Sequence, residues 1–345
     1  MARALWLALA LALSLPSFHS GWTVLTSACF LAEFLSGGRW RPLTTIASEV
    51  SSRRLPASAD GRAIPADLYT AARFTRAPGL VLVHGLSPRG KDDSRVIDAA
   101  VLLARSGWAV AVPTVEGLTA LRLRPEDATA VVAGIRALAE ARYRPVAVLA
   151  VSVGAGPALL AAADPRVAGS VSAVLALGGY ASAVELLRYT LTGAYRFDTA
   201  SGRRPIDERA VEQFARANPE LVDPAGRRLV DNRDPQAVDA LVAELPPATR
   251  RLLAELSPQA AIGRIRAPLF LVHGRDDPAV PFTESRRLAR AARSAGRPVR
   301  MVIVGSMAHV EPGERAGLGD LARLWASFYA FSVTSRAVTW VGGRS

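Results

Sequence analysis

Six short apolar segments recur along the chain, and each has the pattern of a strand that is buried on both faces. They are residues 79–85, 108–114, 145–152, 171–179, 268–274 and 299–305. Nearly continuous apolar runs of this kind are typical of parallel sheets, because both faces of such sheets are covered. Amphipathic stretches with helical spacing, such as 125–143 and 283–296, lie between most of them. The alternation predicts an α/β fold with a mostly parallel central sheet and helices on both faces.

The folded domain is expected to span residues 50–332. Near its start, Asp60-Gly61 is a turn pair between strand-compatible segments and predicts a hairpin. Residues 181–266 interrupt the alternation and read as several helices, which is far more chain than a simple crossover needs. We therefore expect a helical cap insertion beside the edge of the sheet where the strands end. Its aromatic residues either line a pocket or, as is more common, pack the cap: these are Tyr189, Tyr195 and Phe197.

The first 35 residues form an apolar leader that is distinct from this domain. Arg3 precedes residues 4–15, which are apolar except for Ser14, as in the hydrophobic region of an export signal. A helix of that length reaches only about 18 Å, whereas a hydrocarbon core is roughly 30 Å thick. Two alternatives follow: a cleaved signal peptide, with small residues before Cys29, or an uncleaved membrane anchor over residues 4–25. A buried amino-terminal helix is the third alternative.

The first two alternatives predict a protein that is membrane-anchored or exported to the cell envelope, and the third a cytoplasmic one. Membrane association is expected through the amino-terminal segment alone. Residues 36–49 are rich in turn formers and arginine and are predicted to be a linker. Residues 333–345 are predicted to be a carboxyl-terminal tail.

Composition removes several classes of function. The formal net charge is +12, but the basic residues are scattered and form no cluster, so no nucleic-acid partner is expected. Cys29 is the only cysteine, which excludes an internal disulfide and a cysteine-built metal site. The four histidines have no metal-ligand spacing, and His19 in the leader has no partner that the sequence suggests. Neither a metal nor another cofactor is therefore expected.

The clearest chemical signal is a serine where an apolar run changes into a helical pattern. Ser152 ends the run 145–152, and Gly154 and Gly156 follow it before the alanine-rich helix. Ligands of open α/β sheets bind at the carboxyl ends of the strands, so this hydroxyl has a suitable location. A nucleophilic serine on a sharp strand-to-helix turn needs small neighbours, and the sequence Ala-Val-Ser-Val-Gly departs from G-x-S-x-G by one methyl group. The alternative is a serine that caps the helix.

Two further groups follow later predicted strands in the order that a catalytic triad requires. Asp276 and Asp277 come after 268–274, and His309 comes after 299–305. Together with His84-Gly85, this order resembles the α/β-hydrolase superfamily over residues 50–332, most closely the dienelactone hydrolases and the prolyl oligopeptidase-like serine hydrolases. The resemblance implies an α/β-hydrolase fold.

The resemblance also implies roles for these residues. Ser152 is the expected nucleophile, and His309 accepts its proton and later protonates the leaving group. Asp277 is preferred as the acid because it occupies the family's position in H-G-x-x-D-x-x-V-P, while Asp276 is the alternative acid or a turn cap. The backbone N–H of Val153, and by resemblance that of Leu86, are the expected oxyanion donors.

The remaining two histidines of the domain have a bland interpretation. His84 is expected to orient the loop before Leu86, and His273 is expected to be a buried histidine with its hydrogen bonds satisfied. The predicted function is a serine hydrolase that cleaves a carboxylic ester or related acyl bond of a small-molecule acyl substrate through an acyl-enzyme. A peptidase or an acyltransferase on the same triad is the first alternative. A non-catalytic, envelope-attached binding protein on the same fold is the second.

Overall fold

A computed structural model describes residues 21–337 apart from 73–76, 222 and 306–316. An eight-stranded sheet lies at its centre, in the order β1-β4-β6-β5-β7-β8-β11-β12. Within this sheet β4 runs antiparallel to both neighbours, and the pairs from β6 to β12 are all parallel. The strands are β1 (Val50–Arg54), β4 (Ala66–Ala71), β5 (Gly79–Val83), β6 (Ala109–Pro113), β7 (Val146–Val151), β8 (Val171–Leu177), β11 (Leu269–Gly274) and β12 (Val299–Val304). The predicted α/β architecture with a mostly parallel sheet is confirmed.

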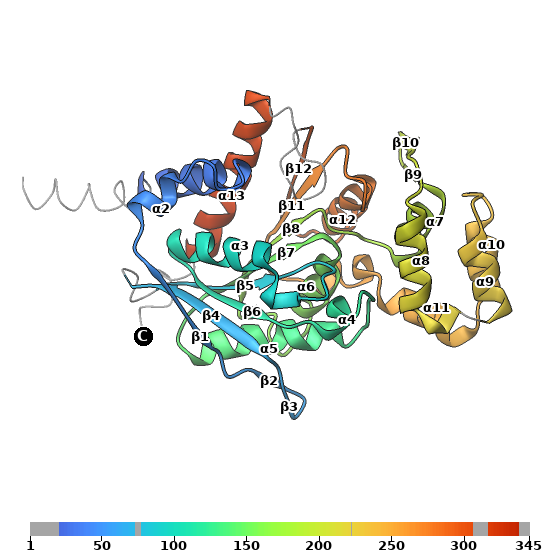
Figure 1. The fold of residues 1–345 in the computed structure, drawn as a ribbon, viewed down its shortest axis with the longest axis horizontal. Coiled ribbons are helices and arrows are strands. Elements are labelled where there is room, and N and C mark those ends of the chain that lie inside the picture. The colour runs from blue at the N-terminus through green and yellow to red at the C-terminus, as the bar shows by residue number, and fades with distance from the viewer. Residues whose placement is uncertain (1–20, 73–76, 222, 306–316, 338–345) are drawn as a thin grey trace, which may run out of the picture.

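Helices cover both faces of the sheet, which explains the continuous apolar strands. The residues of β5 and β6 are buried along their whole length, whereas β1 at the edge is exposed and polar. One face carries α3 (Ser94–Arg105), α13 (Leu318–Ala337) and the helical residues 21–35. The other carries α5 (Asp127–Glu140), α6 (Ala155–Ala162) and α12 (Thr283–Ser294) (Figure 1).

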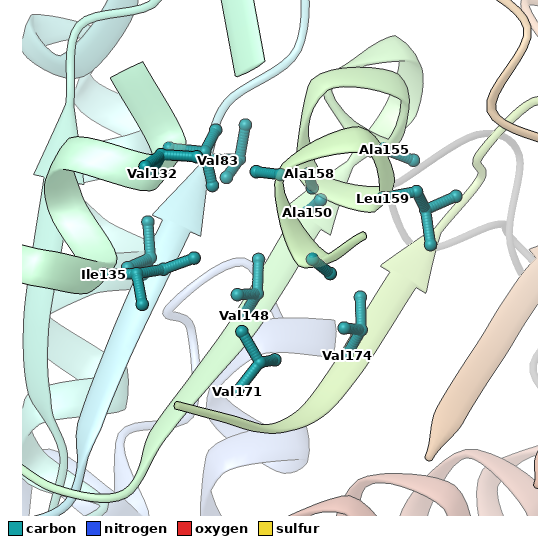
Figure 2. Packing of buried hydrophobic residues seen from close by; sticks show 14 of the residues in the cluster. Val83, Val132, Ile135, Val148, Ala150, Ala155, Ala158, Leu159, Val171 and Val174 are labelled. Atoms are coloured by element: carbon teal, nitrogen blue, oxygen red, sulfur yellow. The ribbon is translucent and has the colours of Figure 1, made fainter. Parts of the chain in front are cut away.

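The packing on the second face uses small side chains where α6 meets the sheet. Figure 2 shows Ala155, Ala158 and Leu159 of α6 near Ala150 and Val174 of the strands below. Alanines at this contact let the helix closely approach β7, the strand that ends just before Ser152. The start of α6 is consequently fixed by backbone and small side chains.

The predicted hairpin near the start of the domain is present. β2 (Ser58–Ala59) pairs antiparallel with β3 (Arg62–Ala63). Asp60 and Gly61 between them have φ values of 52° and 76°, which is the left-handed pair of a tight hairpin turn. Short elements complete the body: α4 (Glu116–Thr119) and the 3-10 turns Gly90–Asp92 and Ser152–Gly154. Three more 3-10 turns, Pro219–Leu221, Pro258–Ala260 and Ile262–Arg264, lie within residues 181–266.

The segment before β1 packs on the body. The ring of Phe30 stacks on Phe328 of α13 with centroids 4.3 Å apart. The carboxylate of Glu33 accepts a hydrogen bond from the Thr44 N–H at 2.9 Å. The predicted linker 36–49 contains a short helix, α2 (Pro42–Ile46), whose Leu43 is fully buried. The turn formers around it concealed this helix in the sequence.

The two ends of the chain also bear on earlier predictions. In the residues that the structure describes, no helix combines the length and the apolarity needed to cross a membrane. Residues 1–20, which hold most of the predicted signal or anchor, lie outside the described residues, so the signal or anchor stays a prediction. At the other end, α13 continues past residue 333 to Ala337, because Phe331 is fully buried and Arg336 lies over the Trp108 ring.

Residues 181–266, called the cap below, leave the sheet after β8 and return at β11. Its helices stand beside the sheet at the right of Figure 1 and share their own apolar cluster. The predicted helical character is present, and a two-stranded hairpin that was not predicted lies within it. The cap elements are α7 (Ala183–Thr192), β9 (Ala194–Phe197), β10 (Ala200–Arg203), α8 (Glu208–Ala217), α9 (Pro224–Asp231), α10 (Val238–Glu244) and α11 (Pro247–Glu255).

Candidate active site

Ser152 lies on a strained turn between β7 and α6. The strand ends at Val151, and Ser152 opens a 3-10 turn that leads directly into the helix. The φ of Ser152 is 57°, in the left-handed region that side chains other than glycine rarely adopt. Its relative exposure is 9%. A strained, nearly buried serine at this place is what a nucleophile turn requires and what an ordinary helix cap does not.

Glycines surround Ser152 where the backbone segments come close. A Cβ atom at Gly154 would lie 2.2 Å from the carbonyl oxygen of His84. A Cβ atom at Gly156 would lie 2.3 Å from the hydroxyl of Tyr180. A Cβ atom at Gly85 would lie 3.1 Å from Cβ of Ser152. The loop after β5 therefore lies directly against the serine turn. An oxyanion site that uses one N–H group from each segment would require this proximity.

His84 holds that loop through both of its ring nitrogens. Its Nε2 accepts a hydrogen bond from the Val115 N–H at 3.3 Å, so the proton is assigned to Nδ1, which donates to the Gly85 carbonyl at 2.8 Å. Burial lowers the pKa of His84, and this favours the neutral ring. The structural role predicted for His84 agrees with these contacts.

The two predicted oxyanion donors lie on the two sides of this contact. Val153 follows Ser152 in the 3-10 turn and is buried. Leu86 follows Gly85, and its side chain is 45% exposed. Within the part of the chain that the structure describes, the N–H of Leu86 has no hydrogen-bond acceptor. Their role as donors stays a prediction.

Asp277 and Asp276 lie in the loop after β11, and their environments differ sharply. Asp277 is 1% exposed, and its Oδ1 accepts hydrogen bonds from the N–H groups of Ala279 and Val280 at 2.8 and 2.9 Å. Asp276 has a side chain that is 66% exposed and forms an ion pair with Arg204 at 2.9 Å. The buried, oriented carboxylate of Asp277 is the better candidate for the acid. Residues 275–280 are called the acid loop below.

His273 has its hydrogen bonds satisfied inside the protein. Its Nε2 lies 2.9 Å from the Val280 carbonyl, to which it must donate, and its Nδ1 lies 2.7 Å from the Ser285 hydroxyl. The Nε2 atom is also 3.5 Å from Oδ2 of Asp277. This ring is buried completely, and its expected structural role fits these contacts.

Ser152 and Asp277 both lie at the carboxyl ends of strands, on the same side of the sheet. β7 and β11 are parallel and are separated by β8, so their ends are about 10 Å apart by the spacing of neighbouring strands. His309, the predicted base, follows β12 and lies outside the described residues. The complete triad thus stays a prediction. Among the described residues, no group of three or more His, Cys, Asp or Glu side chains is placed to hold a metal ion.

Two cavities lie between the body and the cap. One of 370 Å³ lies between residues 122–126 and α11, and one of 460 Å³ lies between residues 120–121 and α8. Arginine side chains line both, and the three aromatic residues singled out in the cap line neither. Tyr189 and Phe197 are buried instead, in contacts between the cap and the body. The packing interpretation of these aromatics is the one that the contacts favour.

Sequence reasoning missed two contacts to the acid loop. The guanidinium of Arg204 and the hydroxyl of Tyr189 both donate to backbone carbonyls there. The sequence singles out Tyr189 only for its aromatic ring. Arg204 is one arginine among many in this chain and has no motif around it, and two of its three contacts in the acid loop are with backbone carbonyls, which leave no signature in a sequence.

Comparisons with known proteins agree with this architecture. Residues 242–333 match the prolyl oligopeptidase family. A puromycin-hydrolyzing peptidase of Mycobacterium tuberculosis is similar in structure, with a TM-score of 0.54 and 19% identity over 84% of this chain and 39% of that one. An acylaminoacyl peptidase of Pyrococcus horikoshii has a TM-score of 0.54 and 15% identity, over 84% of this chain and 42% of that one. Dipeptidyl peptidase 4 of Porphyromonas gingivalis has a TM-score of 0.52 and 15% identity, over 83% of this chain and 35% of that one.

These likenesses have a clear extent. No curated protein matches the chain by sequence. The chain spans about two fifths of the length of the first peptidases it matches. At these low identities the likeness concerns the fold, and the order of the eight strands and the turn at Ser152 agree with it. The chain therefore has the fold of the α/β-hydrolase superfamily.

Proposed function

We propose that the chain is a serine hydrolase that cleaves a carboxylic ester or a related acyl bond. The observation that carries the proposal is the φ of 57° at Ser152, on a turn where Gly154 and Gly85 leave little or no room for a Cβ atom. Such strain persists only where the surrounding structure enforces it, and it is concentrated at functional sites. The turn presents the hydroxyl at the edge of the sheet where ligands of this fold class bind.

In the proposed reaction, Ser152 Oγ bonds to the carbonyl carbon of the substrate while His309 takes the hydroxyl proton. The carbonyl π electrons move to oxygen, where the N–H groups of Val153 and Leu86 stabilise the negative charge. Collapse of this intermediate breaks the acyl bond, and His309 protonates the leaving group. Water then attacks the acyl-enzyme by the same route and regenerates Ser152. Asp277 holds the imidazole and stabilises its cationic form.

A peptide or aminoacyl amide bond is the second candidate for the bond that is cleaved. The match of residues 242–333 to the prolyl oligopeptidase family favours it. The same triad serves both bonds, since the chemistry differs only in the leaving group. The choice between them depends on the space around the site.

The test is covalent labelling of the purified protein with a fluorophosphonate, followed by turnover of two substrate series. We expect the wild type to be labelled and Ser152→Ala to be unlabelled and at least ~10³-fold slower. Ser172→Ala is the matched control, because Ser172 is another buried serine on the neighbouring strand β8. Nitrophenyl esters of increasing chain length and aminoacyl nitroanilides then separate esterase from peptidase activity. Undiminished turnover in folded Ser152→Ala would refute the proposal.

We also propose that the amino-terminal segment attaches the protein to a membrane or directs its export, on the basis of the apolar run 4–15. The full chain should fractionate with membranes or envelope when expressed in bacteria, and a chain lacking residues 1–20 should not. The cut is made at 20 because Phe30 and Glu33 pack on the body. A full-length protein with an intact leader in the cytoplasmic fraction would contradict this proposal.

A further inference from the structure

Three consecutive carbonyl oxygens of the acid loop accept hydrogen bonds from two side chains of the cap. Arg204 donates from Nη2 to the Arg275 carbonyl at 3.1 Å and from Nη1 to the Asp276 carbonyl at 3.0 Å. The Tyr189 hydroxyl donates to the Asp277 carbonyl at 3.1 Å. The Arg204 guanidinium also contacts Oδ1 of Asp276 at 2.9 Å. The backbone of the acid loop is thus held directly by the cap.

The two donors belong to one packed unit of the cap. Tyr189 lies one turn before the end of α7, and its carbonyl accepts from the Gly193 N–H at 2.8 Å. The carbonyl of Gly193 in turn accepts from the Arg204 N–H at 3.0 Å, and a Cβ atom at Gly193 would lie 2.0 Å from the Arg204 carbonyl oxygen. Burial raises the pKa of Tyr189 to about 12, so its hydroxyl keeps the proton that it donates.

Aromatic contacts reinforce the same junction. The Tyr189 ring meets Tyr195 edge-on with centroids 6.1 Å apart, and Tyr195 meets Phe282 in the same way at 5.7 Å. Phe282 lies just before α12 and follows the acid loop. The guanidinium of Arg275 lies 5.8 Å from the centroid of the Phe282 ring. The acid loop is therefore connected to the cap at its beginning and through Phe282 beyond its end.

We propose that Arg204 and Tyr189 are positioning residues that hold the acid loop and so aim the carboxylate of Asp277 at the catalytic histidine. This inference rests on the proposed function of Asp277. Oδ1 of Asp277 is bound to the N–H groups of Ala279 and Val280, so the carboxylate turns with the loop when the loop moves. An acid of this kind works by orienting the imidazole and stabilising its cation, which a misaligned carboxylate does poorly.

The test compares Arg204→Gln with Arg233→Gln. Arg233 is a matched control, because it also donates to two backbone carbonyls, Val230 and Asn232, and pairs with a carboxylate, Glu208, but all within the cap. With a small activated ester, Arg204→Gln should lower kcat/KM roughly 10- to 100-fold, mainly through kcat, as displacement of a catalytic group does. The control should stay within about 3-fold of the wild type.

The pH profile separates positioning from mere support of the fold. The acidic limb of kcat/KM reports the ionisation of the base in the free enzyme, and a well-placed carboxylate raises that pKa. Arg204→Gln should therefore shift the acidic limb to lower pH, whereas Arg233→Gln should leave it in place. The acidic limb of Arg204→Lys should lie between those of the wild type and Arg204→Gln, because one ammonium group cannot bind two carbonyl oxygens as the planar guanidinium does.

A second readout does not depend on activity. Hydrogen exchange at the amides of Ala279 and Val280 should be faster in Arg204→Gln and in Tyr189→Phe than in Arg233→Gln. Tyr189→Phe removes one hydroxyl and keeps the ring contacts, so it decides the matter if Arg204→Gln does not fold. Failure of the proposed function would appear as full turnover in Ser152→Ala, and exchange would still show whether the cap holds the loop. Unchanged exchange and an unshifted pH profile in the folded variants would overturn the inference.

Discussion

The serine turn and the acid loop lie at the same edge of the sheet, but opposite kinds of contact hold them. Around Ser152, the backbone segments pack directly against one another, because glycine and alanine place no large side chain between them. Around Asp277, long polar side chains reach across from the cap and donate to backbone carbonyls. The serine turn should therefore be damaged by an added atom, and the acid loop by a removed donor.

The junction where the cap leaves the body follows the second pattern. Oε2 of Glu284, on α12, accepts hydrogen bonds from the N–H groups of Ala181 and Ser182 at 3.0 and 2.9 Å. Its other oxygen lies 3.0 Å from Nε of Arg287. Arg287 in turn lies over the ring of Phe197 in the cap hairpin. One buried carboxylate thus anchors the first residues of the cap to the body.

The largest expected effect is on catalysis and concerns the two neighbouring carboxylates of the acid loop. Asp277→Asn should lower kcat/KM for an activated ester by about 10³- to 10⁴-fold, because the amide cannot stabilise the cationic imidazole or hold its tautomer. Asp276→Asn should cost about 3-fold or less, since its exposed side chain makes only a surface ion pair. Steady-state kinetics on the two folded variants measures both values. The reverse ranking would assign the acid to Asp276.

The strands of the body could be predicted from the sequence because burial on both faces leaves continuous apolar runs, as in β5 and β7. The turn at Ser152 could be predicted because its close packing requires small residues, and a serine with alanine and glycine around it is recognisable in the sequence. The contacts of Arg204 and Glu284 could not, because side chains that bind distant backbone atoms leave no periodicity and no motif. The β9–β10 hairpin was missed for a related reason: its strands are four residues each, too short to show alternation.

The next largest effect tests the anchor of the cap. Glu284→Ala should lower the free energy of unfolding by about 3–5 kcal/mol, because it leaves two buried N–H groups without their acceptor and removes one of the two carboxylates that pair with Arg287. Glu212→Ala is the control: Glu212 pairs with Arg216 on the surface of α8, and its loss should cost less than about 1 kcal/mol. Denaturant unfolding at neutral pH measures the difference. Equal, small losses would show that Glu284 does not anchor the cap.

A smaller effect tests the serine turn by adding a single methyl group. Gly154→Ala should lower the free energy of unfolding by about 1–3 kcal/mol and reduce fluorophosphonate labelling, because the new Cβ would meet the His84 carbonyl at 2.2 Å. Gly169→Ala is the control, since a Cβ atom there meets nothing within 4 Å. The control should be neutral or slightly stabilising. If Gly154→Ala matched it in thermal unfolding and labelling, the close approach at the turn would not be required.

The smallest effect concerns the burial of His84 beside the serine turn and is measured as the pH dependence of the free energy of unfolding. Burial lowers the pKa of His84 below its ordinary value of 6.5. Below about pH 6.5 the unfolded chain therefore binds a proton that the folded chain does not, and the free energy of unfolding falls as the pH is lowered. His84→Gln should reduce that slope by at most about 1.4 kcal/mol per pH unit between pH 6.5 and 5. Asp127, whose pKa burial raises to about 6, opposes the trend in the same range, so the difference between the two proteins is the quantity to measure. Parallel curves for wild type and His84→Gln would mean that His84 titrates as it does in the unfolded chain and that water reaches the loop beside Ser152.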